Sequence, residues 1–88
     1  MKYYVMTIEQ YTPQGQETKT EQSKVEKRNT EDSALSYFYN TLKTVADSAA
    51  HNYLDIKIIK SDGGIIKKDV YGAYIDTVAQ TPNAETTV

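Results

Sequence analysis

The sequence predicts an α+β fold of the order ββαββ: a four-stranded antiparallel sheet with one amphipathic helix on one face. Three observations lead to this prediction. Residues 53–74 are two β-rich runs around a glycine-rich turn, and residues 2–28 are two further runs around a proline-glycine turn. Between them, residues 31–49 carry apolar side chains at helical spacing. We expect a single domain over residues 1–74 and a flexible tail over 75–88.

The register of the second hairpin depends on the length of its loop. A two-residue loop would place Ile56 opposite Asp69. A three-residue loop, Asp62-Gly63-Gly64, would instead place Ile56 opposite Val70 and Lys57 opposite Asp69. The three-residue loop brings apolar residues together and pairs opposite charges, so we expect this loop, closed by a glycine in the left-handed region.

The first strand is expected over Lys2 to Tyr11, from its β-branched and aromatic content. Both of its faces carry apolar groups, because Met6 and its alternate neighbours lie on one face and Val5 and its alternate neighbours on the other. We expect the face without the helix to be lined by five residues: Tyr3, Val5, Tyr11, Ile59 and Tyr71.

Residues 17–28 form a strongly polar run in which Val25 is the single apolar side chain. Alternating charges of this kind protect an edge strand from aggregation, and the same composition is also found in mobile loops. We expect an edge strand.

A helix is expected from Glu31 to about Ala49. Asn29 or Thr30 can cap its free amides, and acidic residues in the first turn face the positive end of the helix dipole. The apolar stripe predicted to dock on the sheet consists of Leu35, Phe38, Leu42, Val45 and Ala49, with Ala34 and Ala46 beside it.

Composition narrows the range of functions. The chain has 88 residues and no cysteine, which excludes disulfides, thiolate nucleophiles and the usual structural zinc sites. Its net charge of -2 is unlike that of a protein that binds phosphates. No stretch approaches the roughly 20 apolar residues of a membrane-spanning helix. These observations predict a soluble, cytoplasmic protein that does not bind membranes.

Candidate catalytic groups are few. His51 is the one histidine, and no serine or second histidine stands near it at a spacing typical of covalent catalysis. We expect it to satisfy carbonyl groups at the end of the helix. The sequence therefore predicts a non-enzymatic protein with no catalytic residue, no metal ligand and no cofactor.

Tyrosine is unusually frequent, since the chain has eight tyrosines, one phenylalanine and no tryptophan. Tyrosine combines a large contact area with a polar hydroxyl and is enriched at protein interfaces. We expect a protein partner, or a second copy bound to the uncovered sheet face as a homodimer. The predicted contact residues are Tyr3, Tyr11, Tyr37, Tyr39 and Tyr71.

Binding of nucleic acid is the alternative. It would use lysine-rich patches, with tyrosines available for base stacking. The patch residues would be Lys24, Lys27, Arg28, Lys57, Lys67 and Lys68. Interleaved acidic residues weaken the field of such a patch, so a solvated charged surface is the simpler interpretation.

The ββαββ layout, with its polar second strand, capped helix and tight terminal hairpin, resembles small proteins of phages and mobile elements. Among them are some anti-CRISPR proteins, which bind and block a host effector complex. The resemblance covers residues 1–74 and lies in the layout, so it transfers no functional residue. It implies a protein that inhibits a host or defence complex by occupying a surface on it.

Overall fold

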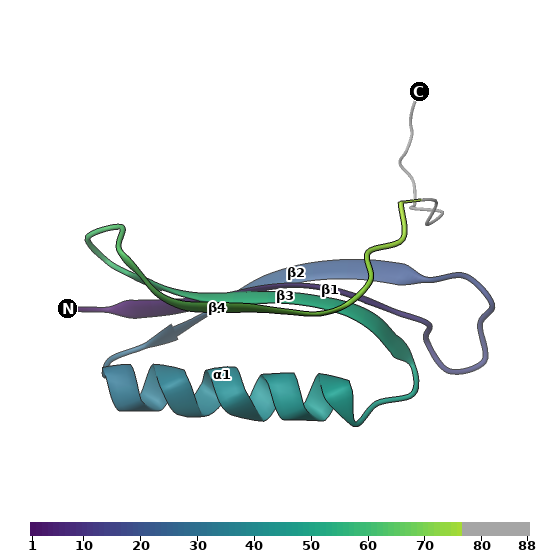
Figure 1. The fold of residues 1–88 in the computed structure, drawn as a ribbon, viewed down its shortest axis with the longest axis horizontal. Coiled ribbons are helices and arrows are strands. Elements are labelled where there is room, and N and C mark those ends of the chain that lie inside the picture. The colour runs from purple at the N-terminus through teal and green to yellow at the C-terminus, as the bar shows by residue number, and fades with distance from the viewer. Residues whose placement is uncertain (77–88) are drawn as a thin grey trace.

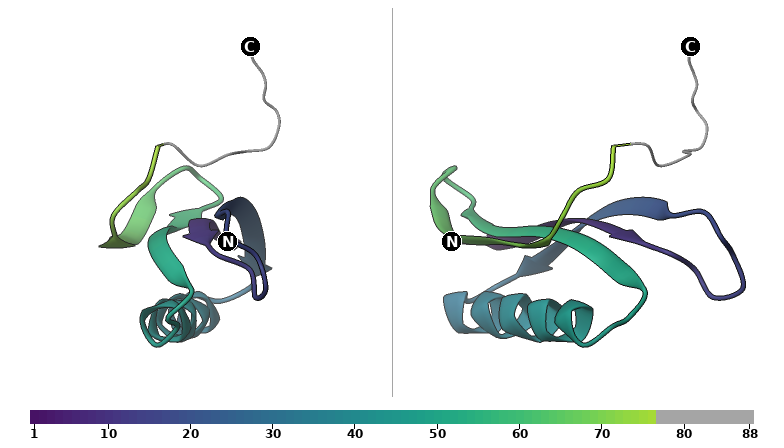
Figure 2. Two further views of the ribbon diagram at one scale, coloured as in Figure 1. Left: turned by 90° about the vertical axis from the view of Figure 1, so that its right-hand side faces the viewer. Right: turned by 45° about the vertical axis from the view of Figure 1, so that its right-hand side comes forward.

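The computed structural model describes residues 1–76 and confirms the predicted ββαββ fold (Figure 1). The elements are β1 Tyr3–Tyr11, β2 Thr20–Arg28, α1 Glu31–Ala46, β3 His51–Lys60 and β4 Ile65–Gly72. All three strand pairs are antiparallel, and the sheet has the order β2-β1-β3-β4. The helix packs along one face of this sheet, which gives two layers when the fold is viewed from its end (Figure 2).

The core lies between α1 and the two central strands, β1 and β3. Val5 pairs with Ile58 and Thr7 with Ile56, and directly opposed residues point to the same side of a sheet. Phe38 of α1 is fully buried against this row. The buried apolar residues are Val5, Ala34, Phe38, Val45, Leu54, Ile56 and Ile58.

The helix begins as predicted and ends earlier than predicted. The Thr30 hydroxyl accepts a hydrogen bond from the Ser33 amide at 3.1 Å and caps the first turn. The last helical residue is Ala46, three positions before the predicted end. Beyond it the Ser48 hydroxyl accepts the Ala50 amide at 3.2 Å, and this local bond replaces a bond of the helical ladder.

The polar segment before α1 is an edge strand rather than a mobile loop. β2 pairs with β1 along its whole length, from Tyr3 opposite Arg28 to Tyr11 opposite Thr20. The strand begins at Thr20, so residues 17–19 of the predicted strand belong to the connection.

The predicted register of the β3–β4 hairpin is wrong. Ile56 lies opposite Asp69, and the loop is closed by two 2.8 Å hydrogen bonds, from Lys60 N to Gly64 O and from Gly63 N to Lys60 O. Four residues, 61–64, lie between the two strands instead of a three-residue loop 62–64, and Gly63 has a left-handed φ of 96° as expected of a glycine that closes the loop. A register shift between Ile58 and Ile59 leaves Ile66 as an extra residue in β4, so Ile66 packs on the core while Val70 faces the other side.

Residues 73–76, called the strap below, turn away from β4 on the side of the sheet opposite α1 (Figure 1). Buried Gln10 binds the backbone of Ile75 in both directions: its Oε1 accepts the Ile75 amide at 2.9 Å, and its Nε2 donates to the Ile75 carbonyl at 3.0 Å. Ile75, the first residue of the predicted flexible tail, is therefore held to β1 by two hydrogen bonds. The rest of that predicted tail, 77–88, lies outside the described residues.

Gly72 supplies the turn from β4 into the strap. Its φ is 76°, and a Cβ at this position would overlap the Asn52 carbonyl oxygen, which accepts the Ala73 amide at 2.9 Å. Gly15 has a similar φ of 81° with nothing within 4 Å of an added Cβ. Alanine substitutions at these two glycines therefore separate the free-energy cost of the left-handed backbone from the cost of an overlap between Cβ and the Asn52 carbonyl.

We expect Gly15→Ala to lower the free energy of unfolding by about 1–2 kcal/mol, the cost of a left-handed non-glycine residue. Gly72→Ala should cost about 2 kcal/mol more, because backbone atoms must also move apart. Urea unfolding followed by circular dichroism measures both values. Equal losses for the two variants would contradict the close approach of Gly72 to Asn52.

Candidate functional site

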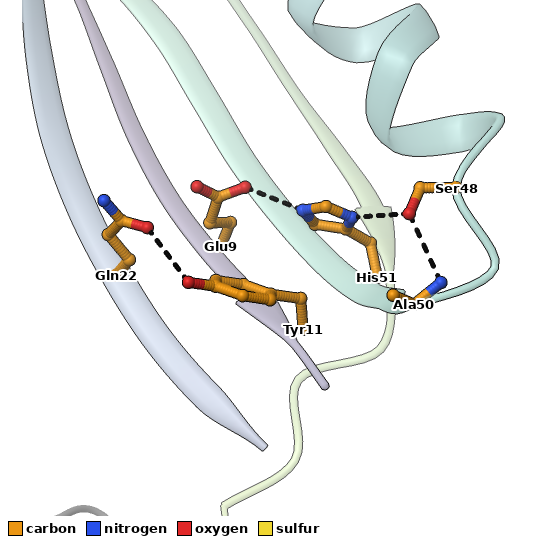
Figure 3. Close-up of polar contacts among 6 residues, drawn as sticks. All are labelled: Glu9, Tyr11, Gln22, Ser48, Ala50 and His51. Carbon is orange, nitrogen blue, oxygen red and sulfur yellow. Dashed lines mark hydrogen bonds and ion pairs between the residues drawn. The ribbon is translucent and has the colours of Figure 1, made fainter. Parts of the chain in front are cut away.

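Glu9, His51 and Ser48 form a chain of polar contacts at the end of the sheet where α1 stops (Figure 3). The Nε2 atom of His51 lies 2.9 Å from Glu9 Oε1, and its Nδ1 atom lies 2.9 Å from Ser48 Oγ. The ring of Tyr11 lies 5.3 Å from the His51 ring between centroids, and the Tyr11 hydroxyl donates to Gln22 at 3.4 Å.

The predicted role of His51 is therefore wrong. It is the first residue of β3, and its ring reaches the side chain of Glu9 on β1 instead of helix carbonyls. The two residues are 42 positions apart, so the contact depends on the β1–β3 register, which shifts between Gln10 and Tyr11. The three-residue spacing between Ser48 and His51 is the only part of this group that could be recognised from neighbouring positions in the sequence.

A carboxylate, an imidazole and a hydroxyl in this order can activate a nucleophile. In the neutral tautomer that carries its proton on Nε2, His51 donates to Glu9, and the Ser48 hydroxyl, which accepts the Ala50 amide, can donate to Nδ1. However, Ser48 follows the carboxyl end of α1, where the helix dipole opposes a developing oxyanion. We interpret the group as a clamp that ties the α1–β3 connection to β1.

A hollow of about 250 Å³ lies next to the clamp, between α1 and the strands β1 and β2. Most of the residues that line it are polar, and they include both charge signs. The lining residues are Glu9, Lys24, Tyr37, Asn40, Thr41, Thr44, Val45 and His51.

The second candidate region is the sheet surface opposite α1, called the open face below. Its members alternate with the buried residues along each strand, and the strand registers place them in rows. They are Glu21, Ser23, Val25 and Lys27 of β2; Tyr4, Met6, Ile8 and Gln10 of β1; Tyr53, Asp55, Lys57 and Ile59 of β3; and Ile65, Lys68, Val70 and Gly72 of β4.

The open face exposes large apolar side chains. Val25, Ile65 and Val70 are 56%, 56% and 57% exposed, and Met6 and Ile8 are more than a third exposed. A hollow of about 350 Å³ crosses the middle of this face, between β2, β1 and β3. In the strand registers Met6, Ile8 and Val25 adjoin one another and Ile65 adjoins Ile59, whereas Asp55 separates Val70 from the first group. Small proteins rarely leave groups of large apolar side chains in water unless they serve an interaction.

The charged groups of the open face are available for intermolecular pairing. Within residues 1–76, no ion pair involves Lys27, Lys57, Lys68 or Asp55. Glu21, at the strap end of the face, accepts the Tyr74 hydroxyl at 2.8 Å, and this bond raises the pKa of Tyr74. The charged groups of the open face that could pair with a partner are therefore Lys27, Lys57, Lys68 and Asp55.

The predicted tyrosine contacts do not form one surface. Tyr3, Tyr11 and Tyr71 lie on the helix side of the sheet and are half-buried, so their predicted place on the uncovered face is wrong. Tyr37 packs beneath the Arg28 guanidinium, 4.7 Å from the ring centroid. Tyr39 is half-exposed on α1, with Lys67 Nζ 5.6 Å above its ring.

Of the other two residues predicted to line the uncovered face, one is misplaced and one is placed correctly. Val5 is fully buried under the helix, whereas Ile59 does lie on the open face. Sequence reasoning missed Met6, Ile8 and Val25. The reason is that both alternating rows of β1 are apolar, so its pattern does not show which row the helix covers.

The predicted lysine patch is split between the two sides of the sheet. Lys27, Lys57 and Lys68 lie on the open face. Lys24, Arg28 and Lys67 lie on the helix side, where Arg28 also pairs with Glu26 at 3.2 Å. The six residues therefore do not form one surface.

Two further features concern ligands and membranes. Among residues 1–76, no three metal-ligating side chains lie close enough together to hold an ion. In the same part of the chain, no helix has the length and apolar content needed to cross a bilayer.

Comparison with known proteins gives no match: no family model, no curated protein and no solved structure is similar to this chain. The choice between the two candidate regions therefore depends on their geometry.

We expect a double-mutant cycle of Glu9→Ala and His51→Ala to give a coupling energy of about 1 kcal/mol, because both side chains are mostly buried and bonded. The exposed Lys43–Asp47 pair of α1, also 2.9 Å apart, is the matched control and should give about 0.3–0.5 kcal/mol. Urea unfolding measures both. A Glu9–His51 coupling no larger than that of the control would contradict the clamp.

Proposed function

We propose that this protein is a non-enzymatic binding module that docks on another protein through its open face. The observation that carries the proposal is the exposure of Met6, Ile8, Val25, Ile65 and Val70 on one continuous side of the sheet. Burial of such residues is the main source of favourable free energy in protein association.

The chemistry of the open face describes the surface it would bind. Its centre is apolar, and Lys27, Lys57 and Lys68 lie around and within that centre. A complementary partner surface has apolar side chains at its centre and carboxylates that reach these lysines.

Nucleic acid fits the open face less well. The net charge of the chain is -2, and Asp55 and Glu21 stand among the lysines of this face. Phosphate binding depends on a strong positive field, which these carboxylates reduce. Tyr4 and Tyr53 are the aromatic side chains in the strand rows of this face, and the Tyr53 ring packs against Tyr74 of the strap, whereas binding of single strands uses several free stacking platforms.

A more specific form of the proposal is an inhibitor. A small module with one large docking face can block a complex simply by covering a surface that the complex needs. This is the mode of action that a resemblance in layout to small proteins of phages and mobile elements would imply. The open face is the part of the molecule that would cover the target.

The test compares two variants that introduce the same charge on opposite sides of the molecule. Val25→Glu changes the open face, and Tyr39→Glu changes α1; the two side chains are 56% and 50% exposed. Each tagged protein is incubated with native host lysate, with and without nuclease treatment, and bound proteins are quantified by mass spectrometry. Circular dichroism confirms that both variants are folded.

We expect the proteins captured by the wild type to be retained by Tyr39→Glu and reduced at least ~10-fold by Val25→Glu, because a buried unpaired charge opposes docking. Equal capture by all three proteins would contradict docking through the open face. Loss of every captured protein on nuclease treatment would favour the nucleic-acid alternative.

A further inference from the structure

We infer that the open face also binds a second copy of this chain, in a face-to-face dimer whose two-fold axis runs across the strands. In this dimer Lys57 of each copy lies on Asp55 of the other copy. The inference rests on the proposed function, because it uses the same surface and names one partner for it.

The first step is the position of the charges in the sheet. Asp55 and Lys57 are alternate residues of β3 and therefore point to the same side, opposite to buried Ile56. In the β1–β3 register, Asp55 lies beside Ile8 and Lys57 lies beside Met6. The centre of the open face thus consists of two rows, one with an acid and one with a base.

The second step is the symmetry that these rows allow. A two-fold axis across the strands, between the two rows, places each strand over its own counterpart and exchanges the rows. Lys57 then meets Asp55 of the second copy, and Met6 meets Ile8 of the second copy. Each contact occurs twice. The same rotation places Lys68 of the edge strand β4 over Val70 of the second copy, where the long lysine side chain can reach water beside the sheet.

The other face-to-face arrangement is unfavourable. A two-fold axis along the strands would place β3 over β1 of the second copy. Asp55 would then meet Ile8, and Lys57 would meet Met6, so each charge would be buried against an apolar side chain. Burial of an unpaired charge costs several kcal/mol, which favours the axis across the strands.

The third step is the apolar surface that such a dimer would bury. Stacked sheets pack about 10 Å apart, with the side chains of the two inner faces in contact. The helices of both copies would lie on the outside, and the exposed apolar residues of the central rows would leave water. The strap occupies the Gln10 end of each face, so the dimer contact is centred on the two rows between the strap and the β3–β4 turn.

The test reverses the two charges in separate chains. Lys57→Asp gives a chain with two acids in the central rows, and Asp55→Lys gives a chain with two lysines. Lys67→Asp and Asp69→Lys are the matched controls, because these residues have the same spacing on β4 but lie on the helix side. Sedimentation velocity measures the oligomeric state of each protein and of equimolar mixtures.

We expect the wild type and both control variants to be dimers. Each open-face variant alone should show a dimer dissociation constant raised at least ~10-fold, because like charges meet across the interface. The mixture of Lys57→Asp and Asp55→Lys should form a heterodimer, since acids then face lysines. Circular dichroism checks that every variant is folded.

A wild type that remains monomeric at high concentration would overturn the second-copy inference, and so would open-face variants that do not recover in the mixture. Either result leaves the proposed function in place if Val25→Glu still abolishes capture of a foreign protein. Failure of both experiments would overturn the proposed function as well.

Discussion

The structure depends on the register between β1 and β3, because this register decides which face of the sheet the single helix covers. With Val5 opposite Ile58 and Thr7 opposite Ile56, one row of side chains becomes continuous across the two central strands and docks on Phe38. The other row, which includes Met6 and Ile8, must then face away from α1. Within residues 1–76, no second helix covers this second row.

Polar side chains at one end of β1 fix segments on both faces of the sheet. Glu9 reaches His51 across the β1–β3 pair, and the neighbouring residue Gln10 binds Ile75 on the opposite side of the sheet. Consecutive residues of β1 therefore anchor the helix connection on one face and the strap on the other. The strap covers only the Gln10 end of the open face, so the apolar middle of that face stays available for a partner.

Local chemistry could be predicted from the sequence, and relations between distant segments could not. The Thr30 cap, the glycine-closed hairpin and the alternation of β1 each follow from a few neighbouring residues. The choice of the covered face was missed because both rows of β1 are apolar. The hairpin register was missed because Ile66 is accommodated as an extra residue, and Glu9 was missed because its contact with His51 spans 42 positions.

The most direct test of the central claim is the solvent accessibility of single methyl groups. Methyl-labelled protein is titrated with a neutral paramagnetic agent at several protein concentrations, and the relaxation of the Met6 and Ile56 methyl groups is measured by NMR. The account predicts that Met6 is strongly affected in dilute samples and becomes protected as the concentration rises, while Ile56 is protected throughout. An Ile56 methyl that is more accessible than Met6, or a Met6 methyl that is protected at every dilution, would contradict the assignment of the open face.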